Sequence, residues 1–269
     1  MNNLDREVYA PHVVQKPRAV VLETPGANDH ENLQYGLQKA GAETEIVHIT
    51  QFLNGEVSLD DLEMLCLAGG FSYGDDFGAG KRLALLMEME RKFSDQLYEF
   101  VQKGKGVLGI CNGFQTMVEL GFPFGFPQSR TQKVATLAPN TSGRFESRWV
   151  RLKPHNMMHL SNGETLMLPV AHGEGKFVTA DEYMIDQIKQ GKLGALQYCD
   201  IDGEPTDEYP LNPNGSIHQI AGLSTGLVNG YMPHPERFLE VANYANHRRE
   251  QITEPHGLLI LQNVVNYFK

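Results

Sequence analysis

One cysteine lies between two glycines in the segment Gly109-Ile-Cys111-Asn-Gly113, after an apolar run and before a helix-like stretch. The apolar run Val107–Ile110 predicts a buried strand. The stretch Phe114–Leu120, closed by Gly121, predicts a short helix. A sharp turn between the two would lift the thiol of Cys111 out of the sheet, and the glycines would remove clashing side chains. This pattern is typical of a nucleophile elbow with sulfur in place of the serine oxygen.

The start of the predicted helix also favours a reactive form of Cys111. Unpaired N–H groups and a partial positive charge at a helix N-terminus stabilise an anion. We therefore expect the thiolate to be favoured over the thiol. The alternative is a buried structural cysteine, which is the usual state of a lone cysteine. The glycine spacing and the strand–helix context favour the nucleophile.

A nucleophilic cysteine needs a base and a group that orients the base. His234 is the best candidate, because it follows an apolar strand and lies between Pro233 and Pro235, which restrict the backbone on both sides. Glu236 comes two residues later, and side chains at this spacing in an extended segment point the same way. We therefore predict that Glu236 holds the imidazole of His234, as in a catalytic triad.

His172 is a rival base. It also follows an apolar strand, and Glu174 lies at the same spacing from it. Because the residues alone separate the two histidines poorly, we place His172 near the site as a substrate-side or structural group. The remaining histidines show no metal-ligand spacing, and we expect no metal site.

Backbone N–H groups can complete the site by stabilising an oxyanion. The elbow supplies the N–H of Asn112, directly after the nucleophile. The pair Gly69-Gly70 follows the apolar strand Met64–Leu67 and can supply the N–H of Gly70, since glycine lets the backbone approach a ligand. A plain turn is the alternative interpretation of this glycine pair.

The order of elements up to about residue 130 predicts an α/β fold, with an open, mostly parallel sheet and helices on both faces. In such sheets functional residues lie at the carboxyl ends of the strands. The predicted elements are a strand at Arg18–Leu22, a helix over 30–40 capped by Asp29 and ended by Gly41, a strand at Glu43–Ile49, a short helix running into a strand over Leu59–Leu67, and one long helix over Lys81–Lys103.

Short strands replace this alternation in the second half, and we expect them to extend the sheet with antiparallel pairs. They are predicted at Lys133–Leu137, Ser147–Lys153, Thr165–Val170, Leu193–Tyr198, Ile220–Ser224 and Leu227–Met232, before a closing helix at His256–Phe268. No linker divides the chain, so we expect an N-terminal leader at residues 1–17 and one domain at residues 18–269.

Composition narrows the class of protein. The chain has 269 residues and a formal net charge of −10, which argues against a nucleic-acid-binding surface. Its three cysteines are widely spaced and odd in number, which indicates neither a disulfide framework nor a zinc site. No apolar signal segment opens the chain, and no apolar run reaches the roughly 18 residues of a membrane span. We therefore expect a cytoplasmic protein without membrane contact.

Together these motifs resemble the class I (triad-type) glutamine amidotransferases. The segment Gly109–Gln115 is similar to the nucleophile motif of that family, and Pro233–Glu236 is similar to its His–Glu motif. Three further stretches resemble the glutaminase components of phosphoribosylformylglycinamidine synthases: Gly69–Asp75, Val170–Gly175 and Asn214–Ser216. The resemblance implies a flavodoxin-like amidotransferase domain over residues 18–269.

The resemblance also implies a reaction and partners. Cys111 would attack the side-chain amide of glutamine, His234 with Glu236 would move the proton, and Gly70 and Asn112 would hold the oxyanion. Ammonia would pass to a synthetase subunit that acts in purine biosynthesis and binds ATP and Mg²⁺, so this chain itself needs no cofactor. Whether a small third subunit takes part is left open.

The resemblance places Gln115 beside the bound glutamine. The sequence contains no phosphate-binding G-x-x-x-x-G-K-[ST] motif, which agrees with an ATP site on the partner. Three alternatives are a glutaminase for a different ammonia acceptor, a stand-alone cysteine hydrolase of the same fold, and a non-catalytic scaffold subunit.

Overall fold

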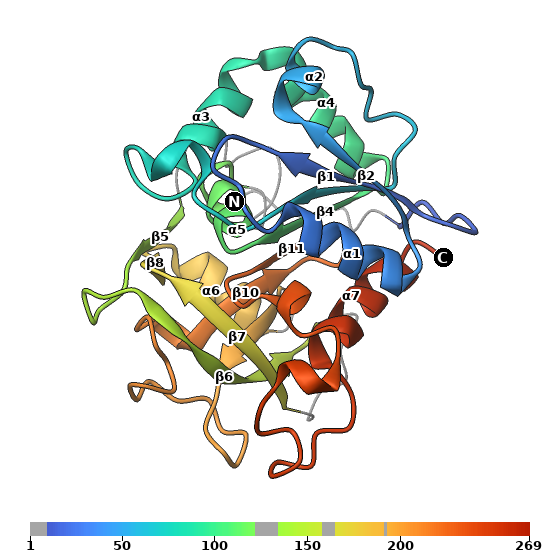
Figure 1. Cartoon of the computed structure of the whole chain (residues 1–269). Coiled ribbons are helices and arrows are strands. Elements are labelled where there is room, and N and C mark those ends of the chain that lie inside the picture. The colour runs from blue at the N-terminus through green and yellow to red at the C-terminus, as the bar shows by residue number, and fades with distance from the viewer. Residues whose placement is uncertain (1–9, 122–133, 158–164, 191–192) are drawn as a thin grey trace.

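Five neighbouring parallel strands form the first part of a nine-stranded sheet in the computed structural model, which describes residues 10–121, 134–157, 165–190 and 193–269 (Figure 1). In spatial order these strands are β2 (Glu43–His48), β1 (Arg18–Glu23), β3 (Met64–Leu67), β4 (Gly106–Ile110) and β11 (Val228–Tyr231). Apolar residues fill β3 and β4, whose burial on both faces is typical of a parallel sheet covered by helices.

Antiparallel pairs extend the sheet beyond β11, as predicted. These strands are β10 (Ile220–Ser224), β9 (Gly194–Tyr198), β6 (Glu146–His155) and β7 (Leu166–His172). The strand predicted at Leu227–Met232 is β11 itself; it pairs antiparallel with β10, but the expectation of antiparallel pairing is wrong on its other side, where it runs parallel to β4. The predicted strand at Lys133–Leu137 is observed as β5 (Ala135–Pro139), and Lys133 lies outside the described residues. β5 pairs with β8 (Glu174–Thr179) in a separate two-stranded sheet.

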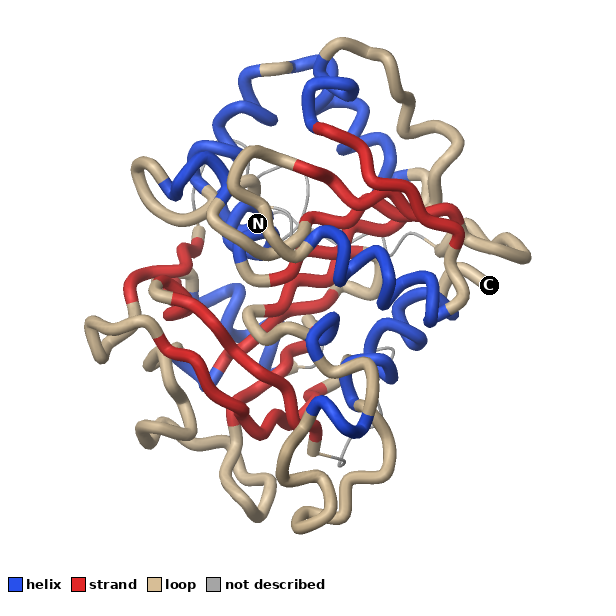
Figure 2. The backbone as a smooth tube through the Cα atoms, viewed as in Figure 1, coloured by secondary structure: helices blue, strands red, loops and turns tan. Residues whose placement is uncertain are grey.

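Helices cover both faces of the main sheet. α1 (His30–Ala40) and α7 (His256–Asn266) pack against each other on one face (Figure 2). α3 (Lys81–Met89) packs against α4 (Arg91–Gln102) and α5 (Asn112–Glu119). The connections β1 to β2 and β3 to β4 run in opposite directions along the sheet, so right-handed crossovers place their helices on opposite faces. The other two α-helices of the described residues are α2 (Ile49–Leu53) and α6 (Glu182–Lys189).

Two predicted helices are wrong. The long helix over Lys81–Lys103 is broken at Glu90, whose ψ of 78° is not helical, so α3 and α4 are separate elements. The short helix expected before β3 is absent from residues 59–63; instead, α2 begins directly after β2. His48 caps α2 by accepting a hydrogen bond from the N–H of Thr50, a role that its position at the end of a strand pattern did not indicate.

Residues 10–17, expected to precede the fold, contact it. The N–H of His12 donates to the carbonyl oxygen of Gly104 at 2.9 Å, and the N–H of Val14 donates to that of Phe268 at 2.8 Å. In the part of the chain that the structure describes, no helix is long and apolar enough to cross a membrane.

The carboxyl ends of β3, β4 and β11 lie side by side. The three strands are parallel neighbours, with Leu67 in register with Gly109 and Ile110 in register with Tyr231. The residues that follow these strands therefore meet at one edge of the sheet, which is where open α/β sheets hold their functional sites.

Candidate active site

Cys111 lies in a sharp turn between β4 and α5, as the elbow pattern predicts. Its φ of 51° and ψ of −105° are strained for a residue with a side chain. Its N–H donates to the carbonyl oxygen of Tyr231 at 2.7 Å, which attaches the turn to the end of β11. The side chain is buried, and its sulfur lies 3.6 Å from the carbonyl oxygen of Ala171.

The glycines on either side of Cys111 are required by packing. A Cβ atom on Gly109 would lie 2.2 Å from the sulfur of Met117, and one on Gly113 would lie 2.1 Å from the carbonyl oxygen of Leu67. Both distances are far inside van der Waals contact. The elbow therefore depends on a close approach of α5 to the ends of β3 and β4, which only glycine allows.

His234 and Glu236 form a buried pair next to this turn. The Nδ1 atom of His234 donates to Oε1 of Glu236 at 2.6 Å, and the imidazole also interacts with the sulfur of Cys111. Burial disfavours the imidazolium, but the charges of Glu236 and Cys111 outweigh this effect and raise the pKa of His234 to about 10. The structure thus brings together the three residues predicted as a triad.

Asp29 occupies the predicted N-cap position of α1, and its side chain is a second carboxylate beside His234. Its side chain makes no capping hydrogen bond to α1. Instead it accepts hydrogen bonds from Arg237 and lies 3.6 Å from Nδ1 of His234. Burial would raise the pKa of Asp29, but the hydrogen bond from Arg237 and the positive charge of His234 hold it below its usual value.

Two carboxylates and the imidazole of His234 also make the one group of possible metal ligands found among the described residues. Ligand atoms of Asp29, His234 and Glu236 lie within 4.8 Å of one another. Arg237 already pairs with Asp29, and Nδ1 of His234 already donates to Glu236. Each of the three groups thus already has a partner within the protein, while Oε2 of Glu236 and Nε2 of His234 have no hydrogen-bond partner among the described residues. A metal-free site stays our prediction.

The loop after β3 borders the same site. A Cβ atom on Gly69 would lie 3.0 Å from Cε1 of His234, which is tighter than usual contact, and 3.5 Å from Cβ of Cys111, which is ordinary contact. Gly69 therefore lies between Cys111 and His234.

Gly70 has a conformation that only glycine adopts easily. Its φ is +140°, and a Cβ atom there would lie 2.7 Å from Cα of Ala27 and from the nitrogen of Asn28. Asn112 begins α5, so its N–H belongs to the helical first turn that lacks intrahelical acceptors. Asn112 directly follows Cys111 in the chain, and Gly70 belongs to the loop that borders the site. That their two N–H groups bind one oxyanion stays a prediction.

His172 is distinguished from His234 by its partners. Its Nδ1 donates to Oδ1 of Asn140 at 3.1 Å, whereas Glu174 accepts a hydrogen bond from the N–H of Ala79. Burial and the positive charge of His234 lower the pKa of His172 to about 4, so its imidazole is neutral at pH 7. A neutral histidine without a carboxylate partner is a weaker candidate for the base than His234.

Gln115 is buried beside the elbow, but its amide is used within the protein. Its Nε2 donates to the carbonyl oxygen of Glu174, and its Oε1 accepts from Nδ2 of Asn112 at 3.1 Å. Its predicted contact with glutamine remains a prediction.

A protein-family model described as a CobB/CobQ-like glutamine amidotransferase domain matches residues 16–268. The chain belongs to this glutamine amidotransferase family. It is 38% identical over 269 residues to "Phosphoribosylformylglycinamidine synthase subunit PurQ" of Methanococcus maripaludis strain S2, covering 94% of this chain and 97% of that protein. It is also 38% identical over 260 residues to the protein of the same name from Dehalococcoides mccartyi strain 195, covering 94% and 98%.

A solved structure agrees with this assignment of the amidotransferase. A chain in "Structure of PurLQS from Thermotoga maritima" matches with a TM-score of 0.67 and 30% identity. The match covers 95% of this chain and 100% of that one, so the two folds correspond over nearly their whole length.

Sequence reasoning missed three contributors to the amidotransferase site. Asp29 and Arg237 set the charge around His234, and Asn140 fixes the ring of His172. Arg237 directly follows the His–Glu motif and so could have been found by its position. Asp29 and Asn140 carry no such signal, because each reaches the site from a distant segment.

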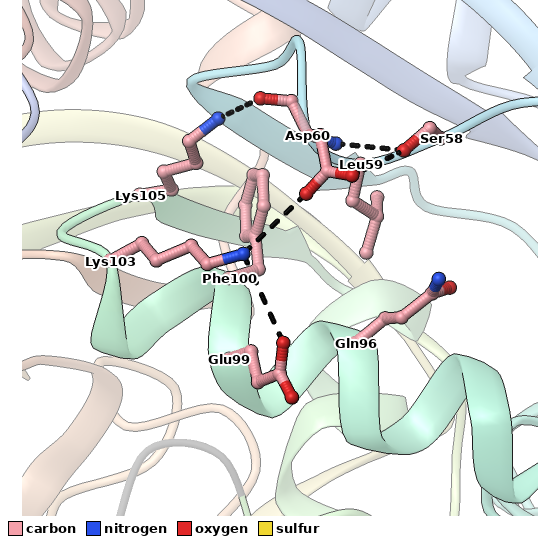
Figure 3. A pocket seen from close by; sticks show the side chains of 8 residues that line it. All are labelled: Ser58, Leu59, Asp60, Gln96, Glu99, Phe100, Lys103 and Lys105. Atoms are coloured by element: carbon pink, nitrogen blue, oxygen red, sulfur yellow. Dashed lines mark hydrogen bonds and ion pairs between the residues drawn. The ribbon is translucent and has the colours of Figure 1, made fainter.

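A small hollow lies elsewhere on the amidotransferase. It has a volume of about 20 Å³, enough for about one water molecule, and Lys103 lies within ion-pair distance of Asp60 and Glu99 along its wall (Figure 3). Its lining segments precede β3 and β4, so it lies at the amino ends of these strands, opposite the edge that holds Cys111. We assign no function to it.

Proposed function

We propose that this chain is the glutaminase subunit of phosphoribosylformylglycinamidine synthase and supplies ammonia to a synthetase subunit in purine biosynthesis. The observation that carries the proposal is the meeting of Cys111, the His234–Glu236 pair and the Gly69-Gly70 loop at the carboxyl ends of three adjacent parallel strands. The PurQ relatives, which match over nearly their whole length, support this choice of acceptor.

The first half of the reaction forms a thioester. The thiolate of Cys111 attacks the side-chain carbonyl carbon of glutamine, and the negative charge moves to the carbonyl oxygen. The N–H groups of Gly70 and Asn112 stabilise this oxyanion. His234 gives a proton to the leaving nitrogen, the carbon–nitrogen bond breaks, and ammonia departs. Glu236 stabilises the imidazolium through Nδ1, which leaves the buried Nε2 for the reacting groups.

The second half releases glutamate. His234, now neutral, takes a proton from water, whose oxygen attacks the thioester carbonyl carbon. The carbon–sulfur bond breaks and the thiolate of Cys111 is restored. One glutamine and one water thus give one glutamate and one ammonia. The two oxyanions form at the same carbon, so one pair of N–H donors serves both steps.

His172 and Gln115 are proposed to lie on the substrate side of this site. His172 is 2% exposed, and its Nε2 is buried without a hydrogen-bond partner among the described residues, which leaves it available to a ligand. Gln115 would contact glutamine through its carbon chain, since its amide is occupied. We propose that ATP and Mg²⁺ bind to the synthetase partner and that no cofactor binds here.

We propose a cytoplasmic location. Cys66, Cys111 and Cys199 are all unpaired in the structure. A reducing compartment keeps such thiols free, which a cysteine nucleophile requires.

The deciding experiment is a Cys111→Ala variant assayed with its synthetase. The synthetase uses ammonia to form an amidine, formylglycinamidine ribonucleotide. Formation of this product from glutamine should disappear, whereas its formation from added ammonium chloride should continue at the wild-type rate. The matched control is Cys199→Ala, which removes a buried thiol outside the site and should keep both activities. Amidine and glutamate are measured separately.

Two results would contradict the proposal. Loss of the ammonia-dependent reaction in a folded complex would argue against an ammonia-donor role. Equal glutaminase activity with and without the synthetase would instead indicate a stand-alone hydrolase.

A further inference from the structure

The side-chain amide of Asn112 connects α5 to the loop that carries Gly70. Asn112 is 1% exposed. Its Oδ1 accepts a hydrogen bond from the N–H of Ser72 at 3.0 Å, and its Nδ2 donates to Oδ1 of Asp75 at 2.9 Å and to Oε1 of Gln115 at 3.1 Å. Both N–H bonds and the carbonyl oxygen of the amide are thus used within the protein.

The opposite side of the same loop is held by the segment after β1. The N–H of Phe71 donates to the carbonyl oxygen of Gly26 at 2.9 Å, and the N–H of Tyr73 donates to that of Pro25 at 2.6 Å. These bonds attach the loop to the segment after β1, but they do not attach it to the elbow. The amide of Asn112 supplies that second attachment.

Loss of this attachment would leave buried polar groups without partners. Ser72 is 2% exposed, so its N–H cannot readily exchange Asn112 for water. A buried N–H group without an acceptor destabilises the folded chain, and the loop can avoid this cost only by moving toward solvent. Such a movement would carry Gly70 away from Cys111.

We propose that the side chain of Asn112 is a positioning group that sets the N–H of Gly70 relative to the N–H of Asn112, so that both donors converge on one oxyanion. The residue after the nucleophile then has two tasks, one through its backbone and one through its side chain. The inference rests on the proposed function, because that function assigns both N–H groups to the oxyanion.

An Asn112→Asp variant tests this role in catalysis. The carboxylate keeps an acceptor for the N–H of Ser72 but places a charged oxygen against Oδ1 of Asp75 and Oε1 of Gln115. Repulsion between the two carboxylates should therefore open the loop. We expect kcat for glutamine hydrolysis to fall on the order of 10²-fold, with little change in KM. Alkylation of Cys111 by iodoacetamide forms no oxyanion and should keep its wild-type rate. An unchanged kcat, or a parallel loss of alkylation, would overturn the proposal.

A second substitution should restore the attachment. With Asp75→Asn added to Asn112→Asp, an amide again faces a carboxylate, and kcat should recover a large part of its loss. The matched control is Asn54→Asp, since the amide of Asn54 also donates to a carboxylate, that of Glu56, but on the exposed surface. This variant should behave like the wild type. If Asn112→Asp does not fold, Asp75→Ala removes one acceptor and should lower kcat to a smaller degree.

Hydrogen–deuterium exchange of residues 69–75 gives a readout that does not depend on glutamine turnover. Exchange should be faster in Asn112→Asp and return toward the wild-type rate in the double variant. Unchanged exchange overturns the positioning role even if the wild-type chain is an active glutaminase. If the wild-type chain with its synthetase does not hydrolyse glutamine, the proposed function fails, and the exchange rates still decide whether Asn112 holds the loop.

Discussion

His234 is a buried residue whose affinity for a proton rises strongly when the chain folds. Its pKa is about 10 in the folded chain and about 6.5 in an unfolded one, so the folded state binds the proton more tightly. This contribution to stability is complete below about pH 6.5 and is lost as the pH rises toward 10. The same pairing with Glu236 is what makes the imidazolium available as a proton donor in the proposed reaction.

A Glu236→Gln variant should remove the charge while keeping an acceptor for Nδ1. We expect glutamine turnover to fall roughly 10³-fold, because the imidazolium loses its counter-charge. The decline in unfolding free energy between about pH 6.5 and 10 should also flatten, which urea denaturation at a series of pH values measures. The control is Glu240→Gln, at an exposed ion pair with Lys39. A variant with wild-type turnover would contradict the role of Glu236.

The meeting of Cys111, His234 and Glu236 was predictable, because the signals for these residues are local. Glycines flank Cys111, and prolines flank His234, within a few positions along the chain. The roles of Asp29 and of the Asn112 side chain were not, because each depends on which distant segment packs against it. Asp29 followed the rule for a helix cap, and the charge of Arg237 drew its carboxylate elsewhere.

At the scale of secondary-structure elements, the turn that holds Cys111 depends on the close packing of α5 against β3. A Gly113→Ala variant places a Cβ atom 2.1 Å from the carbonyl oxygen of Leu67, so α5 must move away from the sheet. We expect a loss of about 1–3 kcal/mol in unfolding free energy and a large loss of glutamine turnover, because Cys111 moves with the helix. Urea denaturation and a glutaminase assay measure the two effects.

Gly173→Ala is the matched control for this substitution. Its Cβ atom would lie 3.8 Å from a ring carbon of Phe145, which is ordinary contact, so stability should change little. Equal stability losses at the two positions would show that the elbow does not need the close approach of α5.

Strand positions were predicted better than helix positions. Ile220–Ser224 was predicted with both bounds, because apolar and turn residues mark its ends. The break at Glu90 was missed, because the apolar repeat continues through it and periodicity alone does not reveal a change in ψ.

At the scale of the whole molecule, one apolar core contains residues from both halves of the chain. Trp149, the single tryptophan, lies on β6, and its ring is 5.2 Å from that of Phe238 and 4.6 Å from that of Tyr244, both after the His–Glu motif. The parallel part of the sheet was predictable from the alternation of strands and helices. The parallel pairing of β11 with β4 was not, because its sequence pattern matches that of the antiparallel strands beside it.

Unfolding should therefore occur in one step. We expect the urea transition followed by Trp149 fluorescence to coincide with the transition followed by far-ultraviolet circular dichroism, because one continuous sheet joins the halves. Two separate transitions would show that the chain contains independently folding units, contrary to the single domain predicted for residues 18–269.

The position of β11 has a consequence for biosynthesis. This strand lies in the middle of the sheet, between β4 and β10, yet it is formed by residues 228–231 of 269. A nascent chain on the ribosome therefore carries its nucleophile strand with one edge unpaired until most of the polypeptide has been made. His234 follows that late strand, so a translation product that ends before it holds Cys111 without the proposed base, and by the proposed mechanism it would not consume glutamine.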